Sequence, residues 1–124
     1  MRLPDPVLVA LGGAAGAVAR YGVGLLAVRW AGMTGLPAGT WVVNALGCVG
    51  IGLAMGLGLP ERVRLVVVVG VLGGFTTFSA YSAETVMLWT AGRPGWATAN
   101  AIGSVLVGVA GVALGLALGR SIAP

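Results

Sequence analysis

Histidine and lysine are absent from this chain of 124 residues, and acidic residues are scarce. The three acids, Asp5, Glu61 and Glu84, are too far apart in the sequence to form a carboxylate pair by spacing, and Cys48 has no neighbouring base. No nucleophile and base can be combined, so the sequence argues against an enzyme. Metal binding by a cluster of histidine, cysteine or carboxylate ligands is equally unsupported. The single cysteine excludes an internal disulfide.

Charge of either sign is also scarce, since only 8% of the residues are charged while 58% are hydrophobic. A soluble domain carries about a quarter charged residues. The mean hydropathy of +1.03 therefore indicates an all-α membrane protein. The net charge of +4 comes from arginines that mark helix ends and form no basic face, so we expect membrane lipid and no nucleic acid as a partner.

Four apolar segments are each long enough to cross the roughly 30 Å hydrocarbon core as a helix. Short connections separate them, so residues 1–124 are predicted to form a single membrane domain. The first segment is too long for the apolar core of a signal peptide. The predicted helices span residues 6–29, 39–59, 63–91 and 95–119.

The arginines give only a weak preference for one orientation in the membrane. One side would carry Arg2, Arg62, Arg64 and Arg120, and the other Arg29 and Arg93, with Arg20 nearer to this second side. Loop arginines set membrane orientation, and four against two or three is a small bias. Charge alone leaves two possibilities open: an N-terminus inside, or insertion in both orientations followed by pairing of opposed copies.

The first two helices combine glycines with isolated polar residues. Gly12 and Gly16 have the four-residue spacing of closely packed membrane helices. Arg20 either snorkels to the surface or faces a water-filled vestibule. In the second helix, Trp41 is typical of interfacial anchoring, and Asn44 must form a hydrogen bond or contact water. For Asn44 alone, a bond between helices is favoured over a place on an ion pathway.

Residues 73 to 82, Gly-Gly-Phe-Thr-Thr-Phe-Ser-Ala-Tyr-Ser, interrupt a strongly apolar stretch. Glycine pairs and β-branched threonines continue a helix poorly, so we predict a break over residues 73–79. A break inside a membrane frees backbone groups, which is tolerated where they are buried in protein or line a polar cavity. Carbonyls freed near Gly73 and Thr76 would suit a cation such as Na⁺.

The fourth helix carries a stripe of glycines that we expect to pack tightly, extended at one end by Asn100 and Ser104. Together with Asn44 and the hydroxyls of the break, these groups could replace the hydration shell of a small anion. The pattern indicates an anion path beside a cation site, and spacing alone does not name either ion.

Three motifs in order resemble the Fluc (CrcB) family of fluoride channels over nearly the whole chain. They are Gly12-Gly-Ala-Ala-Gly-Ala-Val-Ala-Arg20-Tyr21, Gly39-Thr-Trp-Val-Val-Asn44-Ala-Leu-Gly47, and Gly73-Gly-Phe-Thr-Thr-Phe78-Ser-Ala-Tyr81-Ser82-Ala-Glu84. The resemblance implies an antiparallel, dual-topology homodimer of four-helix subunits with two fluoride pores. It also implies a structural Na⁺ at the dimer centre, held by the backbone carbonyls of Gly73 and Thr76.

The resemblance further assigns roles to individual residues. Asn44, Phe78 and Ser104 match pore positions of the family, and Arg20 matches its vestibule arginine. Thr77 and Ser82 are further motif positions with plausible fluoride ligands. One position departs from the family, because the second pore aromatic, usually phenylalanine, is Tyr81. Tyr81 would either retune the pore or impair it in a subunit that works with a different chain, and we favour a working homodimer.

Together with this resemblance, the sequence predicts a passive, fluoride-selective channel that exports fluoride, and the resemblance implies the inner membrane of a bacterium. One alternative is a small four-helix multidrug exporter. It would need an acid in the first helix, where the chain offers only Asp5 near the end, and it leaves the break unexplained. A second alternative is a non-transporting assembly subunit, which fits the glycine stripes but not the clustered hydroxyls.

Overall fold

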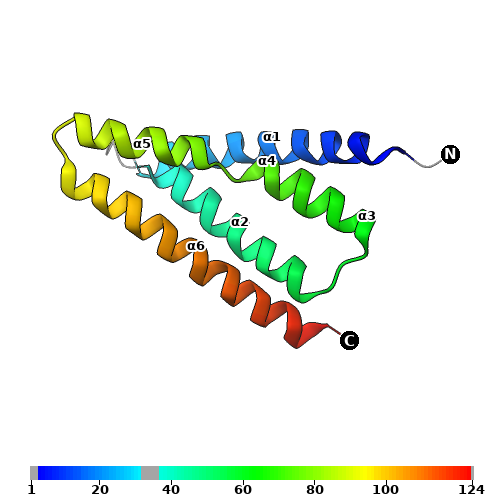
Figure 1. Ribbon diagram of the computed structural model, residues 1–124. Coiled ribbons are helices and arrows are strands. Elements are labelled where there is room, and N and C mark those ends of the chain that lie inside the picture. Colours follow the sequence, from blue (N-terminus) through cyan, green and yellow to red (C-terminus); the bar gives the residue numbers. More distant parts are fainter. Residues whose placement is uncertain (1–2, 32–36, 124) are drawn as a thin grey trace.

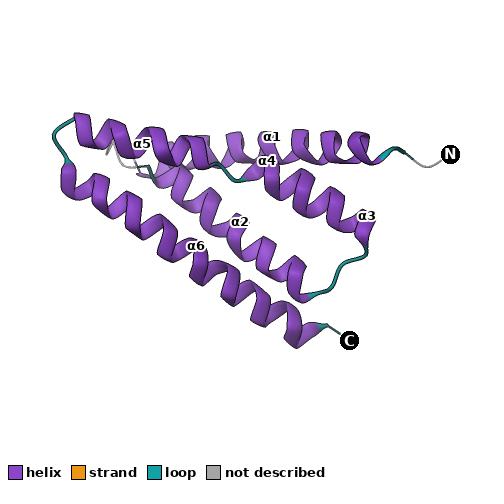
Figure 2. Ribbon diagram, in the orientation of Figure 1, coloured by secondary structure: helices purple, strands orange, loops and turns teal. Residues whose placement is uncertain are grey.

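The computed structural model describes residues 3–31 and 37–123, and these are helical apart from short connections (Figure 2). Four stretches are long and apolar enough to cross a membrane, as predicted: Asp5–Arg29, Ala38–Gly56, Glu61–Thr90 and Pro94–Ile122. Arg2, one of the arginines used to judge orientation, lies outside the described residues. The helices are α1 (Asp5–Ala31), α2 (Ala38–Gly56), α3 (Glu61–Arg64), η1 (Leu65–Leu72), α4 (Gly73–Phe75), α5 (Phe78–Thr90) and α6 (Pro94–Ile122).

Two glycines with positive φ end the second and third crossings. Gly58 has φ +60° after α2, and Gly92 has φ +72° after α5. Glycine adopts this left-handed conformation without the penalty that a Cβ would impose, which is why it commonly follows a helix. A proline begins the segment after each turn, at Pro60 and Pro94. The connections between crossings are therefore short, and sequential helices run in opposite directions (Figure 1).

The helices pack as two pairs. The second and fourth crossings, α2 and α6, lie side by side along their length, and α1 lies along η1 and α4 (Figure 1). The α5 segment leaves the α1 pair and packs on α6 instead. The third crossing thus contacts α1 before its break and α6 after it, which places the break where the two pairs meet.

Glycine permits close contact within both pairs. A Cβ added at Gly52 of α2 would lie 2.1 Å from the carbonyl oxygen of Val112, and one added at Gly115 would lie 2.1 Å from that of Val49. In the other pair, a Cβ at Gly16 would lie 2.0 Å from the Val71 oxygen. These distances leave no room for a side chain. The prediction that the glycine stripes serve tight packing is confirmed.

The third crossing is bent at two residues. Thr76 has φ −77° and ψ 159°, and Thr77 has φ −151° and ψ 114°, so both are extended. They lie inside the predicted interval 73–79, but Gly73 and Gly74 are helical. Gly74 has a different role, because its Cβ would lie 2.4 Å from the carbonyl oxygen of Gly13 in α1. Gly74 therefore lets α1 approach, and the two threonines form the break.

Candidate functional site: a hydrogen-bonded break beside a groove

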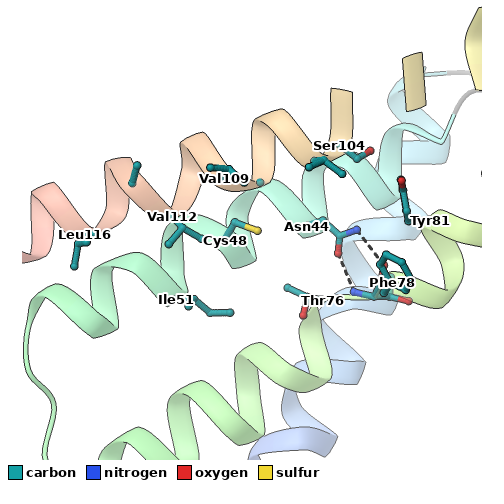
Figure 3. Close-up of a pocket in the computed structure, with 14 residues that line it drawn as sticks. Asn44, Cys48, Ile51, Thr76, Phe78, Tyr81, Ser104, Val109, Val112 and Leu116 are labelled. Atoms are coloured by element: carbon teal, nitrogen blue, oxygen red, sulfur yellow. Dashed lines mark hydrogen bonds between the residues drawn. The ribbon is translucent and has the colours of Figure 1, made fainter. Parts of the chain in front are cut away.

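The Asn44 side chain binds both backbone groups of Thr77 at the break. Its Oδ1 accepts a hydrogen bond from Thr77 N at 2.8 Å, and its Nδ2 donates to Thr77 O at 3.0 Å (Figure 3). This pairing resembles that between two strands and satisfies backbone groups that have lost their helical partners. One turn later in α2, Gly47 makes room for Thr76, since a Cβ there would lie 2.2 Å from Thr76 Cγ2. Two residues of α2 therefore accommodate the break: Asn44 binds its backbone, and Gly47 leaves space for Thr76.

Thr77 also begins the next helix. Its Oγ1 accepts a hydrogen bond from Ala80 N at 3.2 Å, the geometry of an N-cap, and lies 3.3 Å from Ser79 Oγ. The Thr77 residue is 9% exposed. Its two backbone bonds and its cap together hold the extended conformation.

These bonds leave two carbonyls without the donors that a continuous helix would supply. In an α-helix each N–H donates to the carbonyl four residues earlier. The amide of Thr77 donates to Asn44 and not to Gly73 O, and the amide of Ala80 donates to Thr77 Oγ1 and not to Thr76 O. Gly73 is exposed at the surface of the single chain. The amides that would satisfy the carbonyls of Gly73 and Thr76 in a continuous helix therefore donate elsewhere.

A groove of about 730 Å³ begins at the break in the third crossing and runs along α2 and α6. Phe78, Tyr81, Asn44 and Ser104 gather at one end of it, and Val112 and Leu116 line the other (Figure 3). The predicted pore residues that line it are Asn44, Thr77, Phe78, Tyr81 and Ser104. The fold brings these five together from three different crossings.

The two predicted pore aromatics differ in their surroundings. Phe78 is 78% exposed, so this chain alone does not enclose it. Its ring centroid lies 5.3 Å from that of Tyr81, with the planes inclined by 42°. The Tyr81 hydroxyl donates to the carbonyl oxygen of Ala101 in α6 at 3.0 Å. The Tyr81 phenol thus joins α5 to α6.

Ser82 is the predicted pore residue that the groove does not include. Its Oγ donates to Phe78 O at 2.9 Å, within its own helix. The hydroxyl of Ser82 therefore satisfies the preceding turn of α5, whereas that of Ser104 lies at the groove.

Arg20 lines a second pocket, of about 370 Å³, together with Thr40 and Glu84. Thr40 Oγ1 donates to Glu84 Oε1 at 2.6 Å. Thr77 lines both this pocket and the groove, so the break separates the two hollows. Of the two sequence interpretations of Arg20, a side chain facing a vestibule fits this location better than one that snorkels to the surface.

Sequence reasoning missed the connection between Trp41 and Asn100. Trp41, which the sequence indicates as an interfacial anchor, also donates its Nε1–H to Asn100 Oδ1 at 2.6 Å. Asn100, which lies at the end of the stripe that could face a pathway, is 2% exposed. A buried amide needs partners for all its polar groups, which was a signal that Asn100 bonds within the protein. The choice of Trp41 as partner follows from the packing of α2 on α6.

Residues 3–31 and 37–123 contain no group of three or more His, Cys, Asp or Glu side chains placed to bind a metal ion.

Fold and site together define a small multi-pass membrane protein whose third crossing is broken beside a groove that carries hydrogen-bond donors. Residues 7–116 match the family described as CrcB-like protein, Camphor Resistance (CrcB), and the chain belongs to this family. The resemblance found in the sequence is thereby confirmed. So is the expectation that the chain is a bacterial membrane protein and not an enzyme.

Several relatives of known description are similar over nearly their whole length. A protein of Chloroflexus aurantiacus named fluoride-specific ion channel FluC is 46% identical over 90% of this chain and 92% of its own. Proteins of the same name are 46% identical in Novosphingobium aromaticivorans, over 93% of this chain and 95% of theirs, and 44% identical in Paracoccus denitrificans, over 92% and 93%.

Proposed function

We propose that this protein is a passive, fluoride-selective channel that exports fluoride across the bacterial inner membrane. The observation that carries the proposal is the groove at the break, where neutral donors and Phe78 gather in a chain whose relatives are named fluoride-specific ion channels. A passive channel needs binding that is plural but weak enough for the ion to leave. Neutral donors satisfy this condition better than a fixed cation inside the groove.

The candidate ligands are the polar and aromatic groups of the groove that can still offer a positive hydrogen to an ion. Asn44 Nδ2 carries two hydrogens, and the bond to Thr77 O uses one of them. The hydroxyls of Thr77 and Ser104 and the electropositive ring edges of Phe78 and Tyr81 extend the donor set. In this proposal the Tyr81 hydroxyl contributes indirectly, by fixing the ring against α6. Ser82, which lies outside the groove, is retained as a ligand only if a second chain brings the path to it.

The proposed functional unit is an antiparallel homodimer of dual topology. Polar groups at an open groove would be costly against lipid, and Phe78 is too exposed for one chain to form a closed path around it. A second copy over the groove would resolve both problems. The weak arginine bias supports insertion in both orientations, which an antiparallel pair requires.

The proposed cofactor is a structural Na⁺ at the centre of this dimer. The carbonyls of Gly73 and Thr76 fit such an ion, because the amides that would satisfy them in a continuous helix donate elsewhere. Two subunits would supply four such oxygens. The ion, when bound, would neutralise these carbonyl dipoles and join the two breaks.

Arg20 is proposed to line the aqueous entrance for fluoride, because it faces the pocket on the other side of Thr77. A cation there would raise the local anion concentration without binding in the path itself. Glu84 lies in the same pocket, and its Oε1 accepts a hydrogen bond from Thr40 Oγ1.

The alternative functions find less support. Asp5, the acid that a multidrug exporter would need, lies at the first turn of α1, 3.7 Å from Arg62 at the same end of the bundle. An assembly subunit would not need donors around a break. Both alternatives remain possible outcomes of the test below.

The test is efflux from liposomes that contain the purified protein, measured with electrodes selective for fluoride and for chloride. The proposal predicts rapid fluoride release and no chloride release, whereas release of neither ion by folded protein would contradict it. Thermal unfolding in Na⁺ and in K⁺ tests the cofactor. We expect a higher midpoint in Na⁺, since an ion that binds only the folded dimer stabilises it, and Gly73→Val should abolish this difference.

A further inference from the structure

The buried amide of Asn100 joins three crossings through four hydrogen bonds. Its Oδ1 accepts from Trp41 Nε1 of α2 at 2.6 Å and from Ser104 Oγ of α6 at 3.5 Å. Its Nδ2 donates to Thr85 Oγ1 at 2.8 Å and to Tyr81 O at 3.4 Å, both in α5. A primary amide has two donor hydrogens and two acceptor lone pairs. Asn100 has therefore no capacity left for an ion, and it acts within the protein.

The two donors to Asn100 Oδ1 are unequal. The indole N–H has one direction, fixed by the ring, and its bond is short. The Ser104 bond lies at the outer limit of hydrogen-bonding distance. A hydroxyl has a single proton and rotates to suit its surroundings. While that proton points at Asn100, Ser104 presents only lone pairs to the groove, and these repel an anion.

We propose that Trp41, by satisfying Asn100 Oδ1, frees the Ser104 hydroxyl to donate to an anion in the groove. A buried acceptor that loses its donor is costly, so without Trp41 the Ser104 proton would be held at Asn100. With Trp41 in place, the proton turns toward the groove and Asn100 keeps a partner. Trp41 and Asn100 are positioning residues that act through Ser104. The inference rests on the proposed function, which makes Ser104 a fluoride ligand.

The packing of α2 on α6 holds the indole in this position. A Cβ added at Gly103 would lie 2.5 Å from Trp41 Cη2 and 3.0 Å from Cζ2. The six-membered ring of the indole thus lies directly over Gly103, one residue before Ser104. The α6 helix therefore supplies Gly103 as the surface for the ring, Asn100 as the acceptor for its N–H, and the Ser104 hydroxyl.

The experiment measures the fluoride dependence of efflux from liposomes for the unsubstituted protein, Trp41→Phe, Ser104→Ala and the double variant. We expect Trp41→Phe to raise the half-saturating fluoride concentration about fivefold, the factor of one net hydrogen bond. Ser104→Ala should raise it by a similar factor. The double variant should resemble Trp41→Phe, because the Ser104 proton is already withdrawn from the groove there.

Thr85→Val is the matched control, since it removes a bond from Nδ2 of the same amide and leaves both donors to Oδ1 in place. It should lower thermal stability as Trp41→Phe does, without changing the half-saturating concentration. If Trp41→Phe does not fold, Gly103→Ala displaces the indole by contact and is judged by the same criteria.

The inference is overturned if Trp41→Phe leaves the half-saturating concentration unchanged, or if the Trp41→Phe and Ser104→Ala effects multiply as independent changes do. Failure of the proposed function is a separate result, because the unsubstituted protein would then release no fluoride at all.

Discussion

The two ends of the α2 and α6 pair are held together in different ways. At the C-terminal ends of the two helices, Gly56 of α2 meets Gly119 of α6, while Gly52 and Gly115 each lie against a backbone carbonyl of the other helix, so backbone lies directly on backbone. At the opposite end, Trp41 fills the space above Gly103 and donates to Asn100. The same two helices are thus joined by van der Waals contact at one end and by a hydrogen-bonded network at the other.

The difference follows from what each end has to do. Lipid chains are as apolar as leucine, so membrane helices gain little by hiding apolar surface and associate through close packing and hydrogen bonds. Glycine contacts give rigid packing but contain no polar group to offer an ion. The networked end carries Asn44, Thr77 and Ser104 at the groove, and each must stay oriented. Packing by glycine supports the bundle, and the hydrogen bonds arrange the site.

The largest effect should follow from a single methyl group at the glycine end. Gly115→Ala would place its Cβ 2.1 Å from the carbonyl oxygen of Val49, which is backbone and has no rotamer to yield. We expect a loss of at least about 3 kcal/mol of stability, at the upper end of overpacking costs, and little monodisperse protein on size exclusion. Gly22→Ala is the control, since nothing lies within 4 Å of its added Cβ. Unchanged melting of Gly115→Ala would show that the backbones separate easily.

The next effect is expected at the break, for Asn44→Asp. The substitution keeps an acceptor for Thr77 N but replaces the donor to Thr77 O by a second oxygen. It also places a negative charge on the anion path. Fluoride efflux should fall about a hundredfold or more, equivalent to about 3 kcal/mol. Cys48→Ala, one turn further along the same groove, should stay within a factor of about two. Normal efflux from Asn44→Asp would remove Asn44 from the site.

The glycine end could be predicted from the sequence and the network could not. Glycines four residues apart indicate close packing whichever helix they meet, because the reason is local. The position of the break was predicted only as an interval, since Gly73 and Gly74 are as compatible with close packing as with a break. The pairing of Trp41 with Asn100 joins residues 59 positions apart, and it depends on the rotation of α2 against α6. Similarly, the sequence suggests Ser82 as a fluoride ligand, but it does not show that the Ser82 hydroxyl donates to Phe78 O within α5.

A smaller effect is expected for Tyr81→Phe, which introduces the residue that the family resemblance implies at this position. Loss of the hydrogen bond to Ala101 O should lower the stability by about 1 kcal/mol. Because the hydroxyl points at the α6 backbone, fluoride efflux should change less than about threefold. Thermal unfolding and efflux on the same preparation separate the two effects. A large loss of efflux with unchanged stability would mean that the phenol itself contacts fluoride.

The smallest effect in free energy should be that of Arg20→Gln, because Arg20 lines the second pocket and not the groove. Its charge acts over a distance through water, and such attraction is screened by salt, with a Debye length of about 30 Å at 0.01 M and about 3 Å at 1 M. We expect efflux to fall about two- to fourfold at low ionic strength and to match the unsubstituted protein at high ionic strength. Arg29→Gln, on the same helix but outside the pocket, should have less effect at either salt concentration. A loss that persists at high salt would place Arg20 in direct contact with the ion, and the boundary between entrance and path would then lie on its side of Thr77.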